Sequence, residues 1–93
     1  MNKTQKSYTR EEILDKVKKL IAEVLNIDAE KINAGSKIID DLGAESLDIV
    51  TLLMEFEDTY QMKIPDEDAE HMLTVNDAVD YIMNMLEENR AKV

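Results

Sequence analysis

A serine set between a glycine turn and an apolar helix is the residue of this chain best suited to chemistry. The segment around it reads Asp40-Asp41-Leu42-Gly43-Ala44-Glu45-Ser46-Leu47-Asp48. We expect Ser46 on the first turn of a helix, where its hydroxyl is open to solvent. An esterified phosphate there would meet free backbone N–H groups and the positive end of the helix dipole. The pattern favours a covalent attachment point over a catalytic nucleophile.

A serine hydrolase would need Ser46 to be activated by a base that a third group orients. The chain has one histidine, His71, which we expect on an exposed helical position. The nucleophile-elbow pattern also requires glycine two positions before and after the serine, where this chain has Ala44 and Asp48. We therefore do not expect a serine hydrolase.

A calcium loop is the second chemistry to weigh, because Asp66, Asp68 and Glu70 match the first, third and fifth positions of an EF-hand. The sixth position needs glycine for its sharp turn and holds His71. The twelfth needs a bidentate glutamate and holds Asp77. This excludes an EF-hand and predicts no dedicated metal site, while weak and nonspecific binding of divalent cations stays open.

The size and composition indicate one small domain. The chain has 93 residues, 44% of them hydrophobic, and no cysteine, so any thiol chemistry has to come from a cofactor. A fold without disulfide bonds fits a reducing compartment. No apolar run reaches the ~18 residues that a membrane span needs, and the N-terminus lacks the apolar stretch of a signal peptide. We predict a cytoplasmic protein without a membrane span.

The charge is strongly acidic and unevenly distributed. The 21 Asp and Glu residues exceed the 11 Lys and Arg residues, for a net charge of −10. This balance opposes nucleic-acid binding, which needs clustered cations, and favours partners with basic patches. Between Ile38 and Asn89 the only basic residue is Lys63. The acidic part of the chain therefore contains Ser46.

Before that serine the sequence predicts one helix and a long connection. Thr9 and Glu12 have the spacing of a capping box, and helical periodicity then continues to about residue 25. Asn26 is a plausible left-handed stop. The next twenty residues carry turn chemistry, yet isolated apolar side chains suggest that this loop is tied to the core. These side chains are Ile27, Ile32, Ile38, Ile39 and Leu42.

The second helix is predicted from Ser46 to about Tyr60, and it carries two apolar stripes. At ~3.6 residues per turn, one stripe faces the core and comprises Ile49, Leu52, Leu53, Phe56 and Tyr60. The other lies on Ser46's side of the helix and comprises Leu47, Val50 and Met54; we call it the docking stripe. A small apolar patch beside acids is typical of a partner-binding surface, with a broad core face as the alternative.

The rest of the chain predicts a short helix and a final long one. Pro65 followed by acids is typical of a helix start, and Thr74 is a good N-cap for a helix from Val75 onward. With no alternating strand pattern, the fold class is all-α: a small four-helix bundle of three main helices plus one short helix, with a long loop between the first two. We assign 1–8 to a flexible leader, 9–88 to the domain and 89–93 to a frayed end.

The six methionines could also indicate a plastic peptide-binding groove. Because they are spread over several elements, core filling is the simpler explanation. A helical adaptor protein that bears no attached group nevertheless stays as an alternative function.

Taken together, these residues resemble an acyl carrier protein, over residues 9–86. The segment from Asp41 to Leu47 is similar to the family's Asp-Leu-Gly-Ala-Asp-Ser-Leu, with Ser46 at the serine that takes 4′-phosphopantetheine. The surrounding pattern also fits, at Glu30-Lys31-Ile32, Ser36, Phe56-Glu57, Ile64-Pro65-Asp66-Glu67-Asp68-Ala69-Glu70 and Thr74-Val75.

The resemblance implies that the chain is not an enzyme and has no catalytic residue. It also implies that a separate phosphopantetheinyl transferase attaches the arm of coenzyme A to Ser46. The arm's thiol then holds acyl groups as thioesters, and the protein delivers them to enzymes of fatty-acid biosynthesis that have basic docking patches. The bundle shelters the acyl tail between its helices, and the protein acts as a monomer. By analogy, the partner-recognition residues are Glu45, Leu47, Val50, Met54, Glu57, Asp58, Asp66 and Glu70.

Two residues depart from the family's usual pattern. Glu45 replaces an aspartate, and Thr51 occupies a position that is often acidic in fatty-acid carriers. A specialised carrier for a polyketide or another dedicated acyl pathway is therefore an alternative. A peptidyl carrier fits less well, because such domains resemble Gly-Gly-His-Ser or Gly-Gly-Asp-Ser at the serine.

Overall fold

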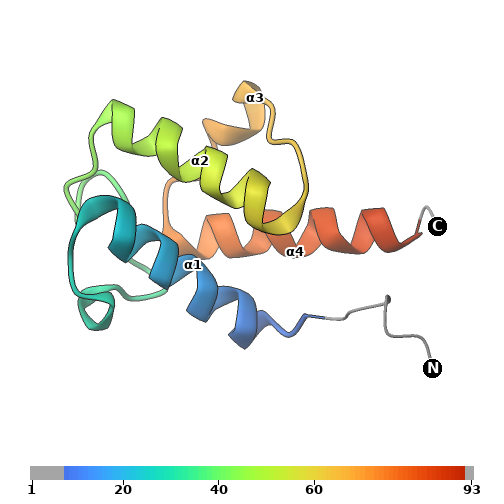
Figure 1. The fold of residues 1–93 in the computed structure, drawn as a ribbon, viewed down its shortest axis with the longest axis horizontal. Helices are drawn as coiled ribbons and strands as arrows, with labels where there is room; N and C mark the ends of the chain where they lie inside the picture. Colours follow the sequence, from blue (N-terminus) through green and yellow to red (C-terminus); the bar gives the residue numbers. More distant parts are fainter. Residues whose placement is uncertain (1–7, 92–93) are drawn as a thin grey trace.

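The structure is a computed structural model that describes residues 8–91, with side chains to residue 88. Its elements are α1 (Arg10–Leu25), the short 3-10 helix η1 (Ala29–Lys31), α2 (Ser46–Tyr60), α3 (Asp66–Ala69) and α4 (Val75–Ala91). Figure 1 shows α1, α2 and α4 as the three long helices, with α3 as one short turn beside them. The predicted all-α bundle with a long loop between its first two helices is confirmed.

The bounds of α1 follow from its caps. The Oγ1 of Thr9 accepts a hydrogen bond from the N–H of Glu12 at 3.1 Å, and the Glu12 carboxylate accepts one from the N–H of Thr9 at 3.1 Å. This reciprocal pair satisfies two of the donors that a helix start leaves free. Asn26 ends the helix in the left-handed conformation, with φ 60°. Both predicted caps are confirmed.

The long connection between α1 and α2 is tied down by backbone hydrogen bonds as well as by apolar side chains. The N–H of Ile38 donates to the Leu73 carbonyl and the N–H of Val75 to the Ser36 carbonyl, both at 3.0 Å. Ile32 and Ile38 are buried, as predicted for a loop attached to the core. Ile39 is the exception, with 53% of its surface exposed, because it lies in the hydrogen-bonded turn that begins at residue 37.

The core lies where α1 packs against α2 and against α4. These two helix pairs have the most extensive contacts. Phe56 and Leu52 of α2 are almost fully buried, and Ile49 and Leu53 pack against them. The predicted core stripe of α2 is confirmed. An ion pair between Arg10 and Asp80 adds a surface connection between α1 and α4.

The last helix begins with a second reciprocal cap. The Oγ1 of Thr74 accepts from the N–H of Asp77 at 3.0 Å, and the Asp77 carboxylate accepts from the N–H of Thr74 at 3.1 Å. Pro65 directly precedes α3, as its N-cap. No helix within residues 8–91 is long and apolar enough to cross a membrane.

The two ends of the described chain lie at the same end of the molecule, away from the start of α2 (Figure 1). Residues 1–7 of the predicted leader fall outside the described residues. Tyr8, its last residue, stands edge-on to Tyr60 with ring centroids 5.7 Å apart. At the other end, α4 continues to Ala91, past the expected domain limit at residue 88.

Candidate attachment and docking site

A tight turn brings the chain to Ser46. Gly43 has φ +78°, in the left-handed region that favours glycine. Its N–H donates to the Ile39 carbonyl at 3.0 Å, and the N–H of Ala44 donates to the Ile38 carbonyl at 3.2 Å. The Ala44 methyl is buried in the core. The turn therefore anchors the backbone two residues before the serine and fixes where α2 begins.

Ser46 is exposed at the first position of the fifteen-residue helix α2. Within residues 8–91, its hydroxyl has no hydrogen-bond partner, and the N–H groups of Ser46 and Leu47 have no acceptor. Free N–H groups at a helix start are where a phosphate oxygen is stabilised. A 4′-phosphopantetheine arm therefore fits this position: the hydroxyl is accessible for the bond, and donors for the phosphate lie beside it.

The acids on either side of the serine, Glu45 and Asp48, are the N-cap and the third residue of α2. The Asp48 carboxylate accepts a hydrogen bond from the N–H of Glu45 at 3.0 Å and so satisfies one donor at the helix start. This cap was not predicted, although the three-residue spacing of Glu45 and Asp48 indicates it. Glu45 is exposed.

The histidine and the candidate calcium ligands are positioned by α3 and by the turn after it. His71 is exposed, but it lies in the turn that follows α3 and not within a helix as expected. In the described part of the chain, no three metal-binding side chains are grouped closely enough to hold an ion. Asp66 and Asp68 belong to α3, and Glu70 is its C-cap, so they do not form the loop that an EF-hand needs.

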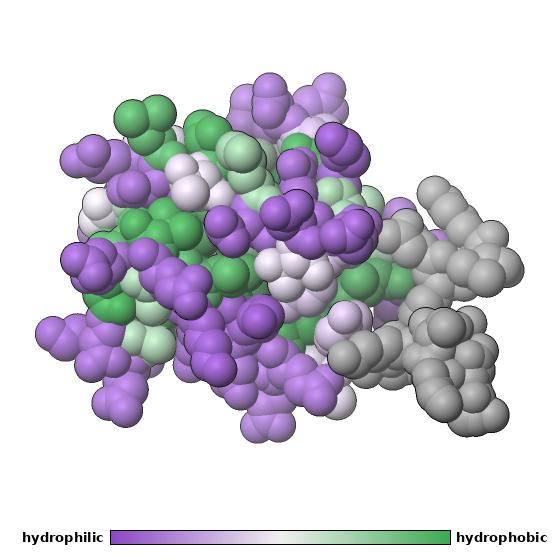
Figure 2. All heavy atoms as spheres, in the orientation of Figure 1, coloured by the Kyte–Doolittle hydropathy of each residue, from purple (hydrophilic) through white to green (hydrophobic). Residues whose placement is uncertain are grey.

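The docking stripe is exposed along one side of α2. Leu47, Val50 and Met54 have 78%, 53% and 62% of their surfaces exposed. Figure 2 shows apolar side chains reaching the surface over the first turns of α2, among hydrophilic neighbours. The alternative of one broad core face is therefore wrong for these three residues. Their role in partner recognition stays a prediction.

The predicted recognition acids are not equivalent. Asp58, Asp66 and Glu70 are exposed, as a docking role requires. Glu57 is half-buried, and its Oε2 accepts a 2.7 Å hydrogen bond from the N–H of Ile64. That carboxylate is already engaged within the fold.

The interior beside Ser46's helix is closely packed. A void of about 10 Å³ lies between α2, α3 and α4, lined by residues that include Leu52, Phe56 and Met72. It has room for about one water molecule. A surface groove of about 520 Å³ adjoins it, and the two linings share Ile38, Ile49, Ala69 and Met72. Sheltering an acyl tail in the interior void, as opposed to the groove, requires side chains to move.

A side-chain hydrogen bond connects Tyr81 of α4 to Asp68 of α3. The Tyr81 hydroxyl donates a 2.7 Å hydrogen bond to the Asp68 carboxylate. Burial, followed by this hydrogen bond and by the nearby negative charges, raises the pKa of Tyr81 to about 12. Burial and the neighbouring Tyr8 likewise raise the pKa of Tyr60 to about 12.

Comparison with known proteins identifies the family. Residues 15–82, which include Ser46, match the family described as the phosphopantetheine attachment site. The chain is 49% identical over 71 residues to the acyl carrier protein of Campylobacter jejuni subsp. doylei, covering 76% of this chain and 92% of that one. Identity to the acyl carrier protein of Rhizobium meliloti is also 49% over 71 residues, covering 76% and 91%.

The structural comparison agrees with the sequence comparison. The solved acyl carrier protein of Enterococcus faecalis superposes with a TM-score of 0.70 at 43% identity, covering 83% of this chain and 98% of that one. The expected family, cofactor and non-enzymatic role are confirmed, and the adaptor alternative is wrong. The chain belongs to the acyl carrier protein family and is a non-catalytic carrier of acyl groups on a covalent 4′-phosphopantetheine.

Proposed function

We propose that Ser46 bears the arm and that this protein carries acyl intermediates for fatty-acid biosynthesis. The observation that supports the site is the exposed Ser46 hydroxyl, which is free of hydrogen bonds within residues 8–91 and lies beside the unpaired N–H groups of Ser46 and Leu47. Once bound, the arm supplies the thiol that holds acyl groups as thioesters and that this cysteine-free chain lacks.

The chain's own residues prepare the site for a transferase. Gly43 and Ala44 fix the turn, and Asp48 caps the helix start. The Ser46 oxygen forms a bond to the pantetheine-side phosphorus of coenzyme A, the bond from that phosphorus to the nucleotide breaks, and 3′,5′-ADP leaves. The transferase supplies the base that takes the hydroxyl proton, so Ser46 needs no base of its own.

The docking stripe and the exposed acids beside it form the surface for partner enzymes. Leu47, Val50 and Met54 offer apolar area, and Asp58, Asp66 and Glu70 meet basic patches together with Glu45. Complementary charge speeds association and selects partners more than it adds affinity.

The carrier domain spans residues 9–88, and the protein is a cytoplasmic monomer that does not bind nucleic acid.

A mass measurement tests the attachment site. Incubation with coenzyme A, magnesium and a phosphopantetheinyl transferase should add one phosphopantetheinyl mass, and Ser46→Ala should abolish the addition. Ser36 is the matched control, because it is buried and its Oγ accepts from the N–H of Asn33 at 3.0 Å. Ser36→Ala should still be loaded. An unmodified wild type across several transferases would refute the proposal.

One observation favours the alternative of a dedicated pathway. Thr51 is exposed on α2, and its hydroxyl donates to the Leu47 carbonyl at 3.1 Å. The docking surface therefore presents a neutral side chain, already hydrogen-bonded within its own helix, where fatty-acid carriers often present an acid. The mass of the acyl group on protein purified from its host distinguishes the two pathways.

A further inference from the structure

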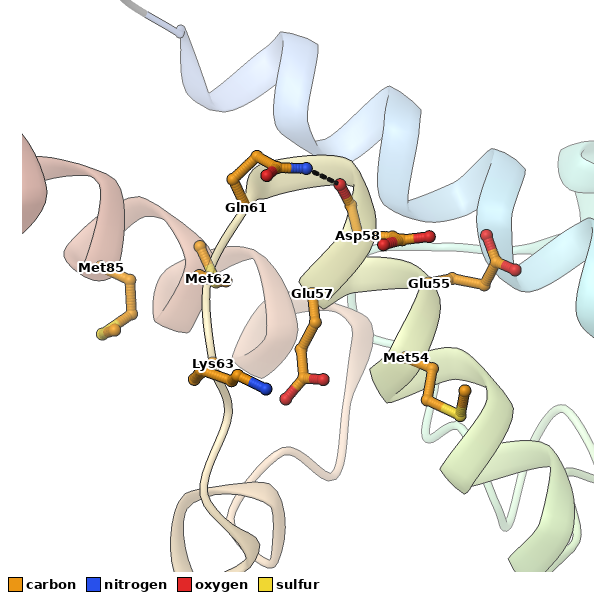
Figure 3. A pocket seen from close by; sticks show the side chains of 8 residues that line it. All are labelled: Met54, Glu55, Glu57, Asp58, Gln61, Met62, Lys63 and Met85. Atoms are coloured by element: carbon orange, nitrogen blue, oxygen red, sulfur yellow. Dashed lines mark hydrogen bonds between the residues drawn. The ribbon is translucent and has the colours of Figure 1, made fainter.

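A groove of about 690 Å³ continues from the docking stripe at the end of α2. Met54 of the docking stripe forms one side, and Met62 and Met85 add further apolar lining from the loop after α2 and from α4 (Figure 3). Glu55, Asp58 and Lys63 line it with exposed charged side chains. The groove therefore joins three separate elements beside a surface already assigned to partners.

Lys63 is the unexpected member of this lining. It is the single basic residue between Lys37 and Arg90. It is exposed and forms no ion pair with any residue that the structure describes. Figure 3 shows its ammonium group directed into the groove on the side of Glu57. One oxygen of Glu57 accepts from the N–H of Ile64, and no ion pair joins this carboxylate to Lys63.

The presence of both charge signs in the lining restricts what can dock here. A uniformly basic surface would be attracted by Glu55 and Asp58 and repelled by Lys63, which is a repulsive element of the kind that selects among partners. A surface with one carboxylate among cations would satisfy all three. The methionines supply apolar contact that adapts to the shape of the inserted side chain.

We infer that this groove is a selectivity site for partner enzymes. It receives a partner segment that places a carboxylate against Lys63, cationic side chains against Glu55 and Asp58, and an apolar side chain on the methionines. The inference rests on the proposed carrier function and deepens it, because it names the partner chemistry that the surface accepts. The docking stripe provides general attachment, and the groove distinguishes between basic partners.

The direction in which Lys63→Glu changes the binding affinity distinguishes this inference from general acidic docking. If the surface simply attracts cations, Lys63→Glu adds an acid and tightens binding. If a partner carboxylate faces Lys63, the same substitution weakens binding, and Lys63→Met falls in between. Lys31→Glu makes the same charge change on exposed η1, outside the groove, and serves as the control.

Binding is measured in the Ser46→Ala background, so that docking is separated from loading. The probes are the host's phosphopantetheinyl transferase and the host enzyme that transfers acyl groups onto the arm, each titrated into ¹⁵N-labelled carrier at low salt. For at least one probe, Lys63→Glu should raise Kd at least ~5-fold, with Lys63→Met between it and the parent, and the effect should shrink at high salt. Lys31→Glu should change Kd less than ~2-fold.

Several results would overturn the inference. Tighter binding by Lys63→Glu, an unchanged Kd with both probes, or an equal effect of Lys31→Glu would each do so. Melting curves of all variants establish that the fold is retained. Failure of the carrier function shows separately, because the wild type would then gain no phosphopantetheinyl mass, whereas failure of the groove alone leaves loading of the wild type intact.

Discussion

The Glu57 carboxylate accepts a 2.7 Å hydrogen bond from the backbone N–H of Ile64. This bond joins α2 to the connection that leads into α3. Ile64 is buried, so its N–H would otherwise lack a partner away from water. An acid expected to serve docking alone therefore also stabilises the fold.

Glu57→Ala should lower the free energy of unfolding by about 1.5–3 kcal/mol, because it leaves a buried N–H without its charged acceptor. Asp58→Ala, at the exposed neighbouring position, should change it by less than about 0.5 kcal/mol. Urea unfolding curves check both values. Equal stability of the two variants would contradict the role assigned to Glu57.

Leu47→Ala should lower kcat/KM for loading by about 5- to 10-fold, which corresponds to ~1–1.4 kcal/mol of docking energy. Its melting temperature should hardly change, because the side chain is exposed. Leu73 is the matched control, with 60% of its surface exposed in the connection between α3 and α4. Loading kinetics that respond equally to Leu73→Ala would argue against a docking stripe on α2.

Gly43→Ala should destabilise the fold by about 1–3 kcal/mol, because a residue with a Cβ is strained at φ +78°. Space is not the cause, since a Cβ at Gly43 would meet no atom within 4 Å. Gly35 is equally open but has no such φ. Calorimetry of Gly43→Ala and Gly35→Ala compares the loss of stability at a position with backbone strain and at one without it. A Gly35→Ala variant as unstable as Gly43→Ala would remove conformation as the explanation.

Alkaline pH should weaken the fold through Tyr81. The folded pKa of about 12 exceeds the ordinary value of 10.0, so the folded state holds the phenol proton more tightly. The associated stability is present below pH 10 and is lost as the pH rises towards 12. Tyr81→Phe should cost about 1 kcal/mol at pH 7 by removing the bond to Asp68 and should flatten this alkaline decline. Unfolding curves from pH 8 to 12 measure both effects.

Salt should stabilise this acidic protein. Repulsion among 21 acidic residues opposes the compact state and is screened as ionic strength rises. We expect the melting temperature to rise by at least about 4 °C between 10 and 200 mM NaCl. KCl at equal ionic strength is the control for screening, and a larger rise with MgCl₂ would report binding of divalent cations. An unchanged melting temperature would refute the repulsion argument.

The elements with strong local signals could be predicted from the sequence. Thr9 with Glu12, Asn26, and the apolar period of α2 each act over a few residues, so the pattern alone determines them. The same holds for Ser46, whose exposure follows from its position at a helix start. The exposed docking stripe was predictable because its side of α2 carries Ser46 and not Phe56.

The features that escaped prediction depend on contacts between distant segments. Nothing in the local pattern indicates that Glu57 reaches Ile64 or that Tyr81 reaches Asp68. Ile39 has the residue type of a core position, yet the turn beginning at residue 37 leaves it exposed. The groove with Lys63 likewise requires α4 to be placed beside the loop after α2.

The position of the chain ends has a practical consequence. Both ends of the described chain, at residues 8 and 91, lie at the end of the molecule away from the start of α2. An affinity tag, a fluorophore or a link to a solid support attached beyond either residue therefore leaves the described domain on that side. Ser46 and the docking stripe then face the solution without obstruction. The carrier can be immobilised on a sensor surface and presented to successive enzymes in a single orientation.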